Sequence, residues 1–126
     1  LYVVESGKPV DRRAADIEQA GTRNKFGLLG GHNLKEKMAE KGVAFEAECR
    51  IFEVCNPHRA KEVLEANMEI STALPCRISL YREGEKTKLA TLRPTALIDL
   101  FSGPELRGVA EEVEATLVRI MDEAAR

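Results

Sequence analysis

The chain has 126 residues, of which 44% are hydrophobic and 32% are charged, so its composition is that of a folded globular protein and excludes a disordered one. Its 19 basic and 21 acidic residues leave a net charge of −2, and no Lys/Arg stripe is present, so we expect no nucleic-acid partner. The length fits a single domain over residues 1–126 that buries its own core without disulfides or a structural metal.

The first half of the chain predicts strands that alternate with helices. Residues 1–5 favour a strand, and Asp11 is a candidate N-cap for the helix that follows. Residues 26–31 favour a second, glycine-punctuated strand. Asn33 then suits the N-cap of a short helix, which Gly42 ends.

The clearest strand pattern covers residues 43–51, where apolar and polar side chains alternate. The alternation slips at Ile51 and Phe52, which indicates either a β-bulge or burial of both faces. Asn56 as N-cap and Pro57 at the first helical position then predict another helix.

The second half of the chain predicts a hairpin followed by helices. Residues 74–81 and 86–94 favour two strands, with the turn at Gly84. A short helix follows Pro94, and the longest helix runs to about residue 124 with an apolar stripe at the helical period. The stripe either covers a sheet or pairs with a second helix, and the first reading is favoured.

Three cysteines, Cys49, Cys55 and Cys76, form no Cys-x-x-Cys pair. An odd number is not typical of a secreted disulfide framework, so we expect a reducing, cytoplasmic location. The first residues lack the basic start and apolar core of a signal peptide. No apolar run approaches the roughly 20 residues that span a bilayer, so we expect no membrane partner.

Three stretches of the sequence, "GLLGGHNLKEKMAEKG", "IFEVCNPHRAKEVLEAN" and "ALPCRISLYREGEKTKLATLRPTAL", resemble domain-of-unknown-function family 302. The resemblance spans nearly the whole chain, and the order of Cys-Asn-Pro and Leu-Pro-Cys carries it. It implies an α+β fold, often found as a homodimer, with family thiols at Cys55 and Cys76. Cys49 lies outside the motif. The resemblance implies no activity, because the biochemistry of the family is unassigned.

Together with the elements above, the resemblance predicts a single mixed β-sheet of about five strands. Its helices pack mainly on one face, and a long amphipathic helix closes the chain.

Two strand-to-helix junctions carry polar groups. His32 and Asn33 end one predicted strand, and Cys55, Asn56 and His58 follow another. If these strands run parallel, both junctions meet at the sheet edge where open α/β sheets bind ligands. The helix N-termini there would favour an anion and lower the pKa of the Cys55 thiol.

The predicted hairpin supplies a second pair, because Cys76 begins one of its strands and Arg93 ends the other. This pair joins Cys55 if the Cys76 strand is antiparallel to the Cys55 strand, and otherwise lies roughly 17–20 Å away. The candidate ligand-binding residues are therefore Cys55, Asn56, His58, His32, Cys76 and Arg93.

Three functional classes follow from these residues. The first is a binding module for a small anionic or thiol ligand, or for a soft metal held by Cys55, His58 and His32, although the sequence requires no cofactor. The second is a thiol enzyme or redox protein with Cys55 as the reactive thiol and Cys76 as its resolving partner, but no recognisable catalytic constellation supports it. The third is a structural dimer in which the cysteines are only small buried hydrophobes.

Overall fold

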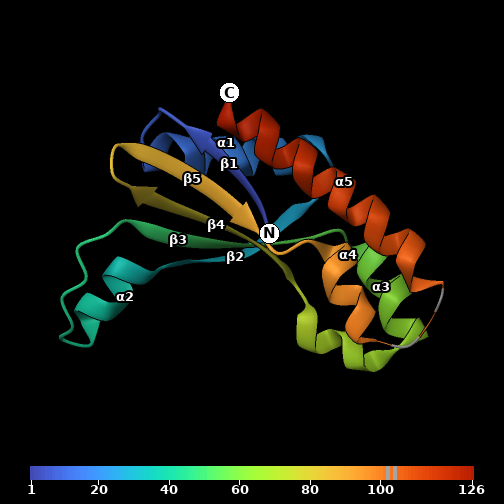
Figure 1. Cartoon of the computed structure of the whole chain (residues 1–126). Helices are drawn as coiled ribbons and strands as arrows, with labels where there is room; N and C mark the ends of the chain where they lie inside the picture. The colour runs from blue at the N-terminus through green and yellow to red at the C-terminus, as the bar shows by residue number, and fades with distance from the viewer. Residues whose placement is uncertain (102, 104) are drawn as a thin grey trace.

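The protein is built on one five-stranded sheet with the strand order β1-β5-β4-β3-β2 (Figure 1). The computed structural model describes residues 1–101, 103 and 105–126. The α+β class and the strand number are confirmed, but every pair of neighbouring strands is antiparallel, so the sheet is not mixed. The strands are β1 (Tyr2–Ser6), β2 (Gly27–Asn33), β3 (Cys49–Cys55), β4 (Cys76–Glu83) and β5 (Lys86–Thr91).

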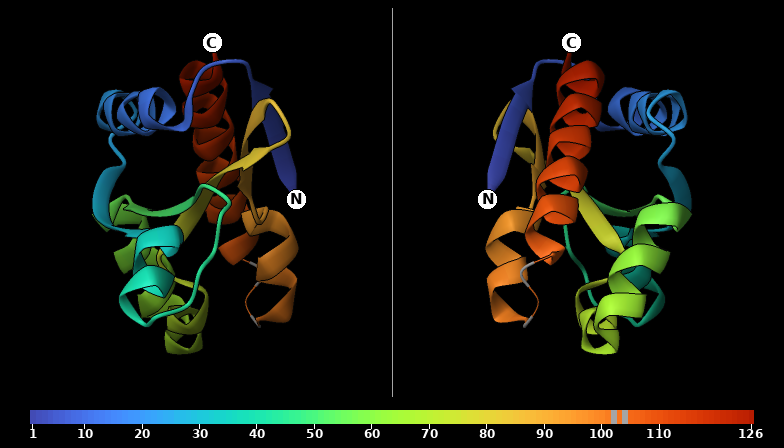
Figure 2. Two further views of the ribbon diagram at one scale, coloured as in Figure 1. Left: turned by 90° about the vertical axis from the view of Figure 1, so that its left-hand side faces the viewer. Right: turned by 90° about the vertical axis from the view of Figure 1, so that its right-hand side faces the viewer.

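Helices cover one face of this sheet, as expected. Figures 1 and 2 show α1 and α5 side by side over that face, while α2 lies at one end of the sheet and α3 and α4 lie at the other. No helix of the described residues is long and apolar enough to cross a membrane. The helices are α1 (Val10–Arg23), α2 (Leu34–Glu40), α3 (Pro57–Ala66), α4 (Pro94–Leu97) and α5 (Leu106–Ala125), with short 3-10 segments η1 (Met68–Ala73) and η2 (Ile98–Leu100).

The main core lies between the covered face of the sheet and the two helices above it. Leu117 and Ile120 of α5 are fully buried, and they belong to one cluster with Ile17 of α1 and with Ile78 and Leu80 of β4. Full burial of one such side chain stabilises the fold by about 1.5–3 kcal/mol. The stripe on the last helix therefore covers the sheet.

A second apolar cluster lies beyond the end of the sheet, under α3, α4 and η1. Its buried members are Val63, Ile70 and Leu106. Partly buried side chains pack around these three, including Leu74 from the segment before β4 and Phe101 after η2. The first turn of α5 thus belongs to the second cluster, whereas its last turns belong to the main core.

Two of the three predicted N-caps are confirmed. The Asn33 side chain accepts a hydrogen bond from the Glu36 N–H, and the Asn56 side chain accepts from two N–H groups of α3. Asp11, by contrast, is not the N-cap of α1. The helix already begins at Val10, with Pro9 in the cap position, so Asp11 lies in the first turn.

The strand predicted over residues 43–51 begins only at Cys49. β2 turns into α2 after Asn33, and Asn33 pairs with Arg50, so residues 43–48 have no neighbouring strand on that side. The register irregularity lies in β2, between Leu28 and Gly30, rather than at the predicted position in β3.

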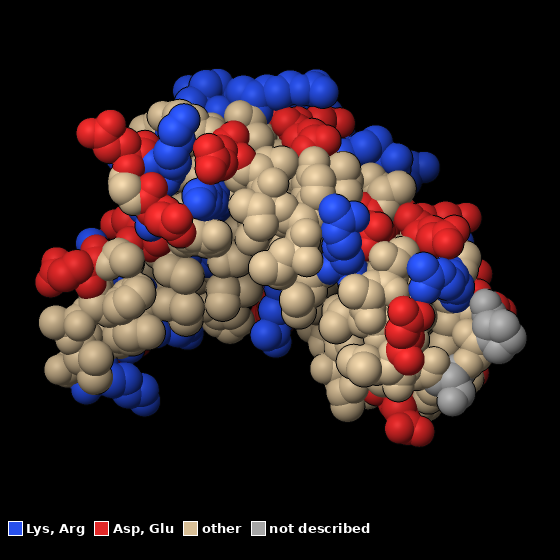
Figure 3. Space-filling view, viewed as in Figure 1, with Lys and Arg blue, Asp and Glu red and all other residues tan. Residues whose placement is uncertain are grey.

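Among the described residues, no helix packs on the other face of the sheet. Figure 3 shows the outline of the molecule recessed beneath this face, between the end with α2 and the end with α3 and α4. Because side chains alternate between the two faces of a strand, Ser79 lies on the uncovered face while its neighbours Ile78 and Leu80 are fully buried on the other. A row across this face runs from Val3 through Ala90 and Ser79 to Ile51.

Candidate functional site

Both family cysteines lie at one end of the sheet. β3 ends at Cys55 and β4 begins at Cys76, and the antiparallel register places Cys76 directly opposite Val54. The chain leaves β3 through the Asn56 cap of α3 and returns to β4 through η1 and Pro75. Of the two arrangements that the sequence left open for these strands, the structure has the antiparallel one.

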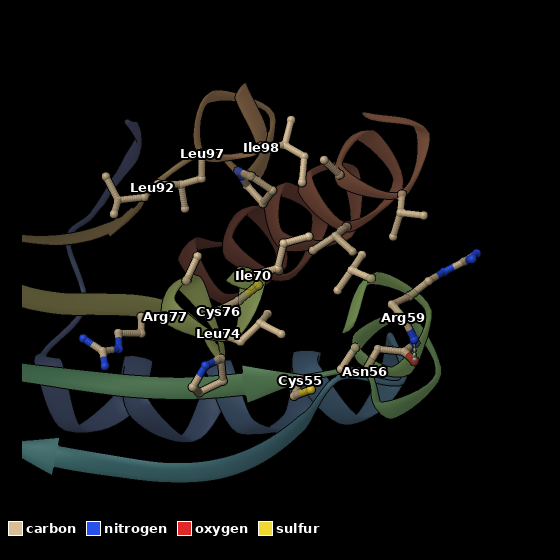
Figure 4. A pocket seen from close by; sticks show the side chains of 18 of the residues that line it. Cys55, Asn56, Arg59, Ile70, Leu74, Cys76, Arg77, Leu92, Leu97 and Ile98 are labelled. Atoms are coloured by element: carbon tan, nitrogen blue, oxygen red, sulfur yellow. Dashed lines mark hydrogen bonds between the residues drawn. The ribbon is translucent and has the colours of Figure 1, made fainter. Parts of the chain in front are cut away.

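A cavity of about 390 Å³ opens at this cysteine-bearing end (Figure 4). Its walls come from the ends of β3, β4 and β5 and from α3, η1, α4 and α5. The cavity lies where the main core meets the second cluster, since Val113 packs on the first and Val63 belongs to the second. Other apolar side chains that line it are Ile70, Leu74, Leu97 and Phe101.

Three of the predicted ligand-binding residues, Cys55, Asn56 and Cys76, line this cavity. The apolar lining residues were not predicted as part of a site, because each of them reads equally well as ordinary core. One signal could have indicated them: the stretch around Pro94–Leu97 holds more large apolar residues than so short a helix can bury against a sheet.

The two thiols in the cavity are neutral at physiological pH. Burial raises the pKa of Cys55 above its ordinary value, and burial together with the nearby Cys55 raises the pKa of Cys76 to about 11. The expectation that the N-terminus of α3 lowers the pKa of Cys55 is therefore wrong. Burial dominates, and the Asn56 side chain already accepts the N–H groups of His58 and Arg59, at 3.0 and 3.3 Å.

His32 lies away from this cavity, because β2 runs antiparallel to β3 and not parallel to it. His32 pairs with Ile51, which is four residues before Cys55, a separation of about 13 Å along a strand. Its Nε2 atom lies 3.1 Å from a carboxylate oxygen of Glu53. The two strand-to-helix junctions consequently lie at opposite ends of the sheet.

His58 and Arg93 do not line the cavity either. His58 is exposed in the first turn of α3. Arg93 follows β5 at the cysteine-bearing end, but its guanidinium lies 5.5 Å from the Tyr2 ring centroid and 3.6 Å from the Glu114 carboxylate. Its Nε donates to the Leu1 carbonyl at 3.3 Å, so Arg93 contacts the β1 edge of the sheet and not the cavity.

The predicted metal-ligand set is not assembled. Within the part of the chain that the structure describes, no group of three or more His, Cys, Asp or Glu side chains is placed to hold a metal ion. The antiparallel strands separate His32 from Cys55, and the His58 side chain does not face the cavity that Cys55 lines. A metal held by Cys55, His58 and His32 is therefore inconsistent with this fold.

Comparisons with known proteins agree with the fold. The model of the family described as "Domain of unknown function DUF302" matches residues 2–124. A solved structure of an uncharacterized conserved protein DUF302 from Bacillus stearothermophilus superposes with a TM-score of 0.92 at 31% identity, covering 99% of this chain and 97% of that chain. No curated protein sequence matches the chain.

Proposed function

This chain belongs to the DUF302 family, and we propose that it binds a small molecule with a largely apolar body. The observation that carries this proposal is the cavity of about 390 Å³ at the cysteine-bearing end of the sheet, lined mainly by apolar side chains. Small-molecule sites in proteins are concave, mostly apolar clefts of about 300–1,000 Å³ with a few polar groups. The cavity has that size and that lining.

The polar lining residues support an apolar ligand body over an ionic ligand in the interior. Cys55 and Cys76 have raised pKa values, so both present neutral thiols, which behave as small hydrophobes with weak donors. The side-chain oxygen of Asn56 accepts hydrogen bonds from the backbone of α3. These three residues of the predicted site thus contribute to the wall of the cavity without adding charge.

A thiol enzyme has less support. A catalytic thiol acts as thiolate and needs a base within about 3 Å, allowing for looser geometry in the free enzyme. Burial raises the pKa of Cys55, and neither His32 nor His58 lines the cavity. We therefore favour binding over thiol chemistry at Cys55.

Filling the cavity tests the proposal. Ala60 lines the cavity from α3, whereas Ala66 ends the same helix at an exposed position outside it. We expect the wild-type protein to bind the neutral apolar dye Nile red, measured by fluorescence titration. Ala60→Phe should weaken binding by about tenfold or more, equivalent to about 1.4 kcal/mol.

The matched variant Ala66→Phe should bind the dye like the wild type, because it adds the same side chain to the same helix outside the cavity. Thermal unfolding of both variants shows that they are folded. Equal binding by the wild type and Ala60→Phe would place the dye elsewhere and refute the proposal, and so would a wild-type protein that does not bind the dye.

The homodimer that the family resemblance implies is also part of our proposal, with the uncovered sheet face as its interface. Val3 is 43% exposed on that face, in the same row as Ala90, Ser79 and Ile51. Sedimentation velocity is expected to give a dimer for the wild type and a monomer for Ser79→Lys, which places a charge in the row. A monomeric wild type would contradict the proposed homodimer.

We also propose a reducing, cytoplasmic location, which the three free cysteines support.

A further inference from the structure

The mouth of the cavity is marked by the lining residues that remain exposed. These are Thr72 of η1, Arg77 near the start of β4, Leu92 after β5 and Leu100 of η2. Leu92 and Leu100 are 59% and 77% exposed, so apolar surface continues from the interior to solvent. Arg77 is the charged residue of this rim.

The charges of the cavity wall have one sign. Among the described lining residues, Arg59 and Arg77 are charged, and neither Asp nor Glu contributes to the wall. Figure 4 shows the two arginines on opposite sides of the cavity, Arg59 on α3 and Arg77 beside the strands. A ligand with a positive group finds no counter-charge here, whereas an anionic group does.

Arg59 is already occupied by acidic partners. Its guanidinium donates to Glu62 at 3.0 Å and pairs with Glu112 at 2.5 Å, and Figure 4 shows it extending away from the cavity. These two carboxylates neutralise it. The Arg59 side chain therefore contributes its aliphatic stem to the wall and leaves little charge for a ligand.

Among the described residues, Arg77 forms one long ion pair, with Glu53, and keeps its hydrogen-bond donors free. Its Nε lies 4.0 Å from one oxygen of Glu53, which is too long for a hydrogen bond, and the other Glu53 oxygen lies 3.1 Å from His32. No hydrogen bond from the Arg77 guanidinium to another described residue is present. The Arg77 side chain is 64% exposed, and Figure 4 shows it extending from the cavity wall toward solvent, so its planar fork of donors lies beside the mouth rather than inside the cavity.

From this arrangement we infer that the ligand is an amphipathic monoanion, with a hydrocarbon body in the cavity and a carboxylate held by Arg77 at the mouth. The inference rests on the function proposed above. A guanidinium fork matches a carboxylate in two parallel hydrogen bonds. Glu53 does not line the cavity, but its carboxylate lies 4.0 Å from Arg77, and this nearby negative charge favours a singly charged head group over a doubly charged phosphate.

Two probes with the same chain separate the head group from the body. We expect isothermal titration calorimetry to show octanoate binding to the wild type about tenfold more tightly than octanol, the difference that one charge-assisted contact provides. Arg77→Gln should remove this preference and leave octanol binding unchanged. Arg59→Gln, the matched control across the cavity, should retain the preference because Arg59 is neutralised by Glu62 and Glu112.

The outcomes distinguish the two proposals. Octanol binding as tightly as octanoate, or Arg77→Gln weakening both probes equally, overturns the monoanion inference while the binding function stands. A preference lost in Arg59→Gln and kept in Arg77→Gln overturns the role of Arg77. Absence of binding by both probes and by Nile red overturns the proposed function and this inference with it.

Discussion

Cys76 lies directly opposite Val54 on the neighbouring antiparallel strand. Val54 is the residue that precedes Cys55 in β3. Directly opposite residues share a sheet face and successive residues alternate, so Cys76 projects with Val54 toward the core and Cys55 projects to the other side. The two thiols therefore reach the cavity from different faces of the sheet end. This arrangement separates them, and it buries Cys76 more deeply than Cys55.

The first prediction concerns thiol reactivity. At about pH 8 we expect iodoacetamide to alkylate Cys76 more slowly than Cys55, and both more slowly than in the urea-unfolded chain, because burial raises both pKa values. Peptide mass spectrometry over a time course gives the alkylation rates of Cys55 and Cys76 in the native protein and in the unfolded chain. A native Cys55 that reacts faster than the unfolded control would restore the thiol-enzyme hypothesis.

The second prediction concerns stability at high pH. An unfolded chain loses the Cys76 proton near the ordinary pKa of 9.0, whereas the folded protein keeps it up to about 11. The stabilisation is thus complete below pH 9.0 and is lost as the pH rises to about 11, in total about 2–3 kcal/mol.

Urea unfolding of the wild type and Cys76→Ala across this range measures the effect. The variant should show a shallower decline with pH. Part of the decline remains in the variant, because the hydrogen bond to Asp122 raises the pKa of Tyr2 as well. Parallel curves for the two proteins would rule out Cys76 as the source.

The third prediction concerns a buried arginine. Arg13 is 1% exposed, and its guanidinium donates to Ser6 Oγ at 2.6 Å, to the Asp16 carboxylate at 2.7 Å and to the Ala124 carbonyl. Arg13→Met leaves these acceptors without their donor and should lower the free energy of unfolding by about 2–4 kcal/mol. Arg12→Met on the exposed side of the same helix should change it by at most about 0.5 kcal/mol. Urea titration of both variants checks the contrast.

The fourth prediction compares two helical glycines. A Cβ on Gly21 of α1 would lie 2.8 Å from the backbone oxygen of Phe26, while a Cβ on Gly108 of α5 would meet no atom within 4 Å. Gly21→Ala should therefore lower the midpoint of thermal unfolding. Gly108→Ala should raise it, because alanine stabilises an exposed helical position by about 0.5–1 kcal/mol relative to glycine. Shifts of the unfolding midpoint in the same direction for both variants would contradict the close approach at Gly21.

Local chemistry was readable in the sequence wherever a residue acts on its immediate neighbours. The Asn33 and Asn56 caps and the hairpin turn at Gly84 depend on contacts a few residues away, and all three are present. The apolar stripe of α5 was readable for another reason, because its helical period is a local pattern even though its contacts are distant in sequence. The start of β3 was not readable, because alternation over residues 43–48 does not reveal whether a neighbouring strand exists.

The candidate site depended on strand direction, which local pattern does not encode. The hairpin settled the direction of β5 relative to β4, but the direction of β2 relative to β3 depends on how α2 and the loop before Cys49 return the chain. That return is antiparallel, so Cys55 and Cys76 share one end and His32 lies toward the other. The cavity was equally hidden, since it forms between segments distant in sequence.

The helix α5 runs through both apolar clusters, with Leu106 in the second cluster, Ala110 and Val113 at the cavity wall and Leu117 in the main core. The hydrogen-exchange rates of its backbone amides are therefore expected to depend on whether the cavity is filled. A molecule that fills the cavity would fasten the first turns of α5 to the strands and slow hydrogen exchange there, while the last turns, already held by the main core, would exchange at an unchanged rate. Exchange in the first half of α5 would thus measure how much of the cavity is occupied, and exchange in the second half would serve as the internal reference.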